Sequence, residues 1–85
     1  MTKSEIEKTL KNFIIETFLF GQDPGISSSD SLLEKGIIDS TSVLELVAFI
    51  EKKFHISVDD TEIVPDNLDS IDSITTYVMG KQEKG

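Results

Sequence analysis

Apolar residues recur at intervals of three and four in three parts of the chain, a spacing that places side chains on one face of a helix. The first stripe consists of Ile6, Leu10, Phe13, Ile14, Thr17 and Phe18, and the second of Val43, Leu44, Val47, Ile50 and Phe54. The third consists of Leu68, Ile71, Ile74, Tyr77 and Val78. We therefore expect helices near residues 4–20, 40–54 and 67–79.

Polar residues at the start of these stripes indicate where the first two helices begin. Ser4 and Glu7 have the spacing of a capping box, in which each side chain bonds the backbone N–H of the other residue. Asp39, Ser40 and Ser42 can each cap the second helix, and the sequence alone does not distinguish among them. In every case Ser40 lies at the N-terminal edge of that helix.

The last third of the chain has its own start and stop signals. Residues 59–64 can form a short helix stopped by Pro65, because proline lacks the N–H that a helix interior needs. Asn67 can cap the final helix, and Gly80 is expected to end it. Alternation of apolar and polar residues is too brief to predict a sheet, so the expected fold is all-α.

A long connection from about residue 21 to residue 38 separates the first two helices. Connections of this length are uncommon in compact domains unless their side chains are anchored. The anchors that we expect are Leu32, Leu33, Ile37 and Ile38, with one helical turn over residues 29–35 closed by Gly36. The loop should then deliver Asp39 and Ser40 to a fixed position.

The length of 85 residues suits one domain, residues 1–85, folded over about 4–79 and followed by a polar tail at 80–85. The predicted architecture is a bundle of three to four helices with the long loop between the first and second helices. Its core is expected to include Leu44, Val47, Ile50, Ile63, Ile71 and Ile74.

Composition restricts the partners of this domain. Sixteen acidic residues oppose eight lysines, and the net charge of -8 disfavours nucleic acids and anionic membranes as partners. Basic protein surfaces are the complementary partners. The chain has no cysteine and no long apolar run, so we expect a cytoplasmic protein without disulfides or a membrane segment.

Ser40 is the candidate for chemistry because the loop presents it at a helix N-terminus. Backbone N–H groups and the positive end of the helix dipole favour a phosphate at such a place. The simpler interpretation is that Ser40 only caps the helix, which is the most common role of a serine in this position.

The wider sequence context favours modification. Residues 36–47, followed by Phe49, Glu51 and Phe54, resemble the attachment region of acyl carrier proteins, and the resemblance continues through Ile71. It implies that Ser40 receives 4′-phosphopantetheine from coenzyme A, through a transferase, and carries an acyl group as a thioester. Asp39 would help to bind the transferase and its magnesium ion. Thr41 departs from the family, which usually has an aliphatic residue there in contact with the modifying enzyme.

The resemblance also implies a docking surface on the second helix. Glu45 and Glu51 match acidic positions that meet basic patches on loading enzymes and on downstream acyl-processing enzymes. Lys52 and Lys53 do not match fatty-acid-type carriers, so the chain more closely resembles stand-alone carriers of dedicated pathways, which are loaded by a ligase or a transferase. We expect a monomer. Aminoacyl and D-alanyl carriers share this architecture, so the cargo stays open.

Two further interpretations belong to other classes of protein. A catalytic pair of Ser40 and His55 would have to span roughly 20 Å along the intervening helix at 1.5 Å per residue, so we expect no enzyme. The acidic residues between 59 and 72 lack the spacing of a calcium loop, so we expect no metal site. An acidic helical adaptor without a prosthetic group is the remaining alternative, and it would function without the Ser40 hydroxyl.

Overall fold

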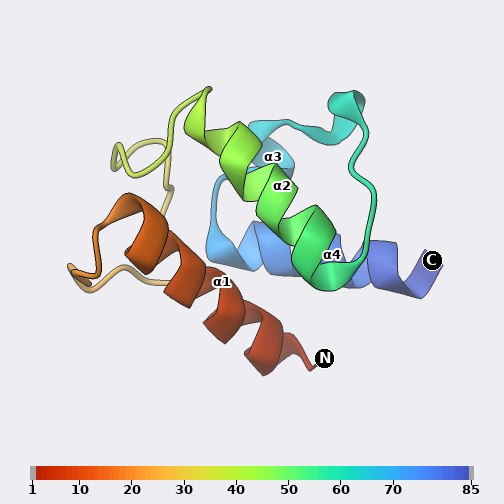
Figure 1. The fold of residues 1–85 in the computed structure, drawn as a ribbon, viewed down its shortest axis with the longest axis horizontal. Coiled ribbons are helices and arrows are strands. Elements are labelled where there is room, and N and C mark those ends of the chain that lie inside the picture. Colours follow the sequence, from red (N-terminus) through yellow and green to blue (C-terminus); the bar gives the residue numbers. More distant parts are fainter. Residues whose placement is uncertain (1, 85) are drawn as a thin grey trace.

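The computed structural model describes residues 2–84, which form four α-helices and one short 3₁₀-helix. The helices are α1 (Lys3–Phe18), α2 (Ser42–Phe54), η1 (Asp60–Glu62), α3 (Pro65–Leu68) and α4 (Ile71–Lys84), arranged as in Figure 1. No strand occurs in this range, which confirms the predicted all-helical fold. None of the helices is both long enough and apolar enough to cross a membrane.

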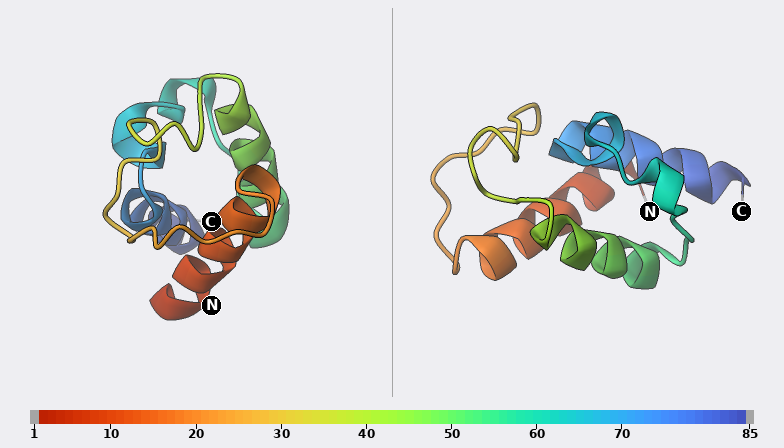
Figure 2. Two further views of the ribbon diagram at one scale, coloured as in Figure 1. Left: turned by 90° about the vertical axis from the view of Figure 1, so that its left-hand side faces the viewer. Right: turned by 90° about the horizontal axis from the view of Figure 1, so that it is seen from above.

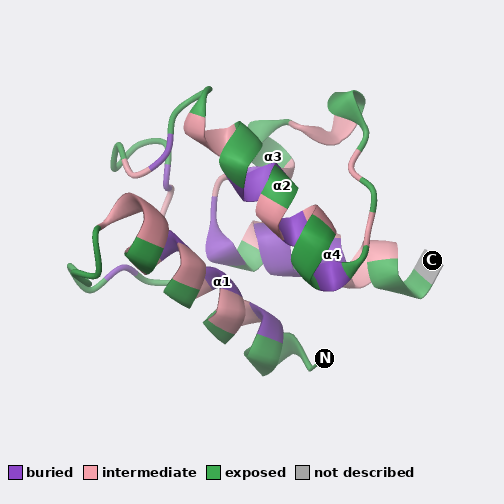
Figure 3. Cartoon of the chain, viewed as in Figure 1, coloured by how far each residue is buried: buried purple, intermediate pink, exposed green. Residues whose placement is uncertain are grey.

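The core lies between the inner faces of the helices, where the buried residues face one another (Figure 3). Among the expected core residues, Val47, Ile50, Ile71 and Ile74 are buried and Ile63 is half-buried. The expectation for Leu44 is wrong, because its side chain is 57% exposed. At about 100° per residue, Leu44 lies roughly 100° around α2 from the centre of the buried stripe, so helical spacing alone could not place it inside.

Helix α1 begins earlier than expected. The capping box pairs Thr2 with Glu5 instead of Ser4 with Glu7. The Thr2 N–H donates to Glu5 Oε1 at 3.0 Å, and the Glu5 N–H donates to Thr2 Oγ1 at 3.2 Å. Both pairs have the same spacing of three residues, so the spacing alone does not distinguish them.

The helices near the C-terminus also differ from the expectation. Residues 59–64 contain only η1, and Pro65 begins α3 instead of stopping a helix. A proline at the first position of a helix loses no hydrogen bond, which explains this placement. Asn67 lies within α3 and does not cap α4. Gly80 does not end α4, which continues to Lys84 because nothing at Gly80 requires a turn.

The long loop, residues 19–41, covers one end of the bundle, whereas the connection between α2 and α3 runs at the other end (Figures 1 and 2). Of the expected anchors, Leu32 and Ile38 are buried, but Leu33 is 38% exposed and Ile37 is half-buried. Ile26, which the sequence pattern does not single out, is buried as well. The helical turn before Gly36 is present, and Gly36 closes it with a φ of +70°.

Hydrogen bonds from the start of α4 hold this loop in place. The Leu32 N–H donates to the Asp69 carbonyl oxygen at 2.7 Å, and the Asp72 N–H donates to the Ser28 carbonyl oxygen at 2.9 Å. The Asp69 carboxylate accepts from the Ser31 hydroxyl at 2.7 Å and from the Leu33 N–H at 3.0 Å. Asp69 therefore fixes the loop that leads to Asp39 and Ser40.

Candidate functional site

The site is built around the start of α2, where Thr41 holds the N-cap position without a side-chain bond and the capping bonds come from the carboxylate of Asp39. Asp39 Oδ1 accepts from the backbone N–H groups of Thr41, at 2.9 Å, and Ser42, at 2.7 Å. The Asp39 carbonyl oxygen accepts from the Val43 N–H at 3.0 Å. These bonds select Asp39 from the three candidate caps, and they leave the hydroxyl of Ser40 free of that role.

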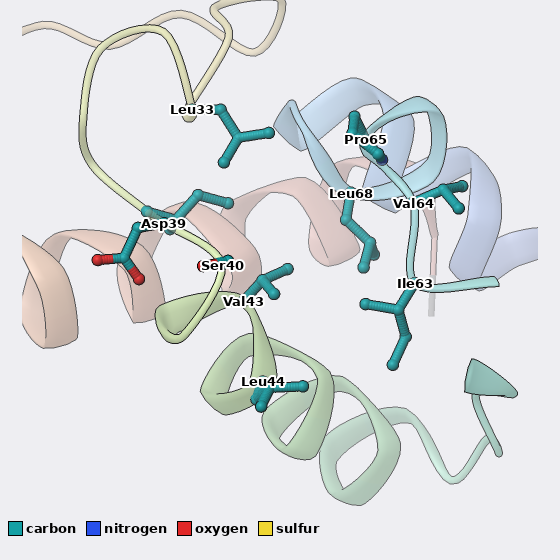
Figure 4. A pocket seen from close by; sticks show the side chains of 10 residues that line it. Leu33, Asp39, Ser40, Val43, Leu44, Ile63, Val64, Pro65 and Leu68 are labelled. Atoms are coloured by element: carbon teal, nitrogen blue, oxygen red, sulfur yellow. The ribbon is translucent and has the colours of Figure 1, made fainter. Parts of the chain in front are cut away.

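The same bonds keep Asp39 ionised. Hydrogen bonds from the backbone N–H groups of Ser42 and then Thr41 hold the pKa of the Asp39 carboxyl below its ordinary value. An anion is thus fixed next to Ser40. In Figure 4 the carboxylate is directed away from the neighbouring cavity.

Ser40 is exposed, and no residue between 2 and 84 hydrogen-bonds its hydroxyl. Thr41 is exposed beside it and makes no side-chain cap. The site therefore presents a serine hydroxyl that another protein can surround, two residues before the start of a helix whose dipole favours a phosphate. This arrangement is suited to a phosphodiester formed by an external enzyme.

A cavity of about 290 Å³ opens directly beside Ser40 (Figure 4). Apart from Asp39 and Ser40, every residue around it is apolar, namely Leu33, Ile38, Val43, Leu44, Ile63, Val64, Pro65 and Leu68. The walls come from the long loop, α2, the end of the connection between α2 and α3, and α3 itself. The cavity can therefore take an apolar group attached near the Ser40 hydroxyl.

The structure separates the two glutamates that the resemblance places on the docking surface. Glu45 is exposed, one turn along α2 from Ser40. Glu51 is half-buried, and its Oε2 accepts from the Val58 N–H at 2.9 Å. The charge of Glu45 is available to a partner, whereas Glu51 has a structural bond within the chain.

His55 lies at the opposite end of α2 from Ser40. It is the C-cap residue, it adopts the left-handed conformation with a φ of +56°, and it is exposed. The whole of α2 separates the two side chains, so they form no catalytic pair.

Two parts of the site had no signal in the sequence pattern. Asp69 belongs to an acidic stretch that resembles a solvated surface, yet its carboxylate bonds residues 36 and 38 positions away along the chain. The cavity combines the loop, α2 and the region around α3, whose proximity is set by the tertiary fold. A long-range contact of this kind has no local periodicity that could reveal it.

Comparisons with known proteins identify carrier proteins as relatives of this chain. No family model matches the chain. It is 33% identical over 74 residues to the probable acyl carrier protein PigG of Serratia sp. (strain ATCC 39006), covering 87% of this chain and 85% of that protein. It is 27% identical over 75 residues to a D-alanyl carrier protein of Streptococcus suis (strain 98HAH33), covering 88% of this chain and 92% of that protein.

A solved structure shares the fold. A chain of "Crystal structure of FAD-dependent dehydrogenase" aligns with this protein at a TM-score of 0.73 and 26% identity. The alignment covers 81% of this chain and 97% of that chain, so the two chains are of similar length.

Proposed function

Because the chain belongs to the acyl carrier protein family and is a carrier protein, we propose that it carries its acyl group on a 4′-phosphopantetheine arm attached to Ser40. The observation that supports this proposal is the exposed hydroxyl of Ser40 between the anionic cap Asp39 and an apolar cavity. The arm would supply a terminal thiol, which holds the acyl group as a thioester.

The attachment itself is a phosphoryl transfer from coenzyme A. Ser40 Oγ attacks the phosphorus nearest the pantetheine, the new bond is a phosphodiester, and adenosine 3′,5′-bisphosphate leaves. The serine proton passes to a base of the transferase. Asp39 keeps its charge through its lowered pKa, and Oδ2, which the backbone bonds do not use, is the atom that would face the magnesium ion of the transferase.

We further propose that all catalytic steps belong to the partners of this chain and take place in the cytoplasm, where coenzyme A is available. Thr41 and Glu45 flank Ser40 on the exposed side of α2, so they are the residues that a transferase or a loading enzyme would meet first. A basic patch on such an enzyme would complement Glu45. Glu51 would contribute less, because Val58 already occupies one of its oxygens.

The relatives define which cargo and which enzymes to test. Their names include an acyl and a D-alanyl carrier, so loading should be tested with adenylate-forming ligases supplied with carboxylic acids and with amino acids. A flavin-dependent dehydrogenase is a further partner class to test, since the similar solved structure carries the name of one.

The decisive experiment is incubation with a phosphopantetheinyl transferase, coenzyme A and magnesium, followed by measurement of the intact mass. The wild type should gain one phosphopantetheine group, and Ser40→Ala should gain none. Ser42→Ala is the matched control and should be modified like the wild type, because Ser42 lies within α2 and is half-buried. Modification of Ser40→Ala, or peptide fragmentation that locates the arm on Ser42, would contradict the assignment.

The adaptor hypothesis makes a different prediction. An acidic adaptor would bind its partner equally well as wild type and as Ser40→Ala, and the protein from its natural host would have the mass of the bare chain. A carrier isolated from its host should include a fraction with the arm, with or without an acyl group.

A further inference from the structure

The connection between α2 and α3, residues 55–64, forms one wall of the cavity through Ile63 and Val64 (Figure 4). None of its residues is buried, and Ile56, Val58 and Ile63 are half-buried against the core. Few buried apolar contacts mean a low free energy of local opening. Other bonds must therefore hold this wall in position.

Two carboxylates provide side-chain bonds of this kind, in addition to the backbone bonds that join Val64 to α3. At the start of the connection, Glu51 Oε2 accepts from the Val58 N–H at 2.9 Å. Near its end, Glu62 Oε1 accepts from the Tyr77 hydroxyl at 3.1 Å and from Lys81 Nζ at 2.7 Å. Because Glu62 directly precedes Ile63, its attachment to α4 fixes the part of the wall that faces the cavity.

The Glu62 side chain also organises its own segment. Its Oε1 accepts from the Asp59 N–H at 3.1 Å, which completes the cap of η1. The Glu62 carbonyl oxygen accepts from the Asn67 side chain at 2.9 Å, which joins η1 to α3. One residue thus links the connection, α3 and α4.

The charges around this residue make Lys81 important. Besides Glu62, which accepts from the Tyr77 hydroxyl, the negative charges of Asp59 and Glu51 contribute to raising the pKa of Tyr77. Burial, followed by the hydrogen bond to Glu62, raises the pKa of Tyr77 to about 12, so its hydroxyl stays a donor at neutral pH. Lys81 neutralises part of this charge and lies over the Tyr77 ring at 5.8 Å from its centroid. Loss of Lys81 would leave the carboxylates to repel one another.

We propose that Glu62, held by Tyr77 and Lys81, is the positioning residue that fixes the movable wall of the cavity and thereby sets how long an acyl group this carrier shelters beside Ser40. The inference rests on the proposed arm at Ser40. With Glu62 in place, Ile63 and Val64 limit the cavity, and only a short group fits. Release of Glu62 lets this wall move away from α2, so a longer group is sheltered.

The test uses the full chain loaded at Ser40 by a phosphopantetheinyl transferase that accepts acyl-coenzyme A, with butyryl, octanoyl and dodecanoyl groups as probes. The variants are Tyr77→Phe, which removes only the hydroxyl, and Lys81→Gln, which removes the charge. Lys8→Gln is the matched control, because Lys8 is an exposed lysine on α1. The rate at which hydroxylamine cleaves each thioester measures how well the cavity protects the acyl group. The NMR chemical shifts of the Ile63, Val64 and Leu68 amides report whether the wall of the cavity moves.

In the wild type and in Lys8→Gln, we expect butyryl to be cleaved more slowly than dodecanoyl. In Tyr77→Phe and Lys81→Gln, cleavage of dodecanoyl should slow severalfold, while that of butyryl stays the same, and the amide shifts should change most with the long chain. A purely structural role of Glu62 would lower stability in the variants without changing this dependence on chain length.

Cleavage profiles that coincide in all four proteins would overturn the inference, whether or not the acyl groups are protected. Circular dichroism verifies that each variant folds, and Tyr77→Phe keeps the test valid if Lys81→Gln unfolds. Failure of the transferase to load Ser40 in the wild type would instead refute the proposed function. The two failures are therefore distinguishable.

Discussion

The two long connections of this chain, residues 19–41 and residues 55–64, are held by different forces. The first is longer, yet it buries Ile26, Leu32 and Ile38. It also makes two backbone hydrogen bonds across the molecule, one donated by the Leu32 N–H and one accepted by the Ser28 carbonyl oxygen. The second is shorter and buries no side chain. Carboxylates of Glu51 and Glu62 provide its main attachments.

The difference shows that the length of a loop does not determine its rigidity. Buried apolar surface and backbone bonds neither titrate nor depend on charge screening, whereas carboxylate bonds at half-exposed positions do. The carrier therefore presents Ser40 from a loop anchored by buried side chains, whereas the segment that faces its cavity is attached through carboxylates. Four predictions test this comparison, in order of the expected size of the effect.

The largest effect is expected in the first connection, at Leu32. Its side chain is fully buried, so Leu32→Ala should lower the free energy of unfolding by about 2–5 kcal/mol. Leu33→Ala is the control next to it, and its 38% exposed side chain should cost less than about 1 kcal/mol. Urea unfolding measures both, and equal losses would show that Leu32 does not anchor the loop.

The next effect concerns the bonds between the loop and the start of α4. Asp69→Ala removes the acceptor for the Ser31 hydroxyl and the Leu33 N–H, and it should cost about 1–3 kcal/mol. Modification of Ser40 should slow as well, since the loop positions it. Asp66→Ala removes an exposed carboxylate with the same charge and should change neither quantity. If modification of Ser40 slowed in Asp66→Ala but not in Asp69→Ala, Asp69 would not be the residue that anchors the loop.

A smaller effect should separate the two glutamates of α2. Glu51→Ala removes one bond to the second connection and should lower the free energy of unfolding by about 1 kcal/mol, whereas Glu45→Ala should stay within about 0.5 kcal/mol. Glu45→Lys should nevertheless slow the reaction with the transferase or a loading enzyme, and it should weaken the salt dependence. Asp66→Lys is the matched charge reversal outside α2. Asp69 is unsuitable for this purpose, because its carboxylate bonds the long loop. If Asp66→Lys were the slower of the two, the docking surface would lie near α3.

The smallest effect appears only in acid. Lys81 and the Asp59 N–H hold the pKa of the Glu62 carboxyl below its ordinary value, so its stabilising contribution is complete above an unfolded value of roughly 4.3 and is lost as pH falls through the lower folded value. Amide exchange followed by NMR below about pH 4 should therefore show Asp59 losing protection before Leu32. Simultaneous loss at both amides would indicate that the two connections open as one unit.

Local patterns predicted much of the fold and the centre of the site. The stripes through Ile14, Ile50 and Ile74 identified three helices because side-chain periodicity depends only on neighbouring residues. Asp39 and Ser40 were placed at the start of α2 for the same reason. The assignment of the arm to Ser40 stays a prediction, as does the monomeric state.

The errors occurred where contacts between distant segments decide the outcome. Leu44 has helical spacing but lines the cavity with an exposed side chain, because it lies outside the buried stripe of α2. Glu51 resembles a surface charge, although the connection folds back to bond it. Gly80 is a different, local case, because it has the residue type of a helix end but its backbone stays helical.

The sequence by itself determined that this chain forms helices with a serine and an aspartate at the start of the second, since spacing and capping act over a few residues. The tertiary structure decided that Asp69 anchors the long loop, that Glu62 joins the second connection to α4, and that an apolar cavity lies beside Ser40. These features depend on which side chains meet after the helices pack, and residues that meet in this way share no local pattern.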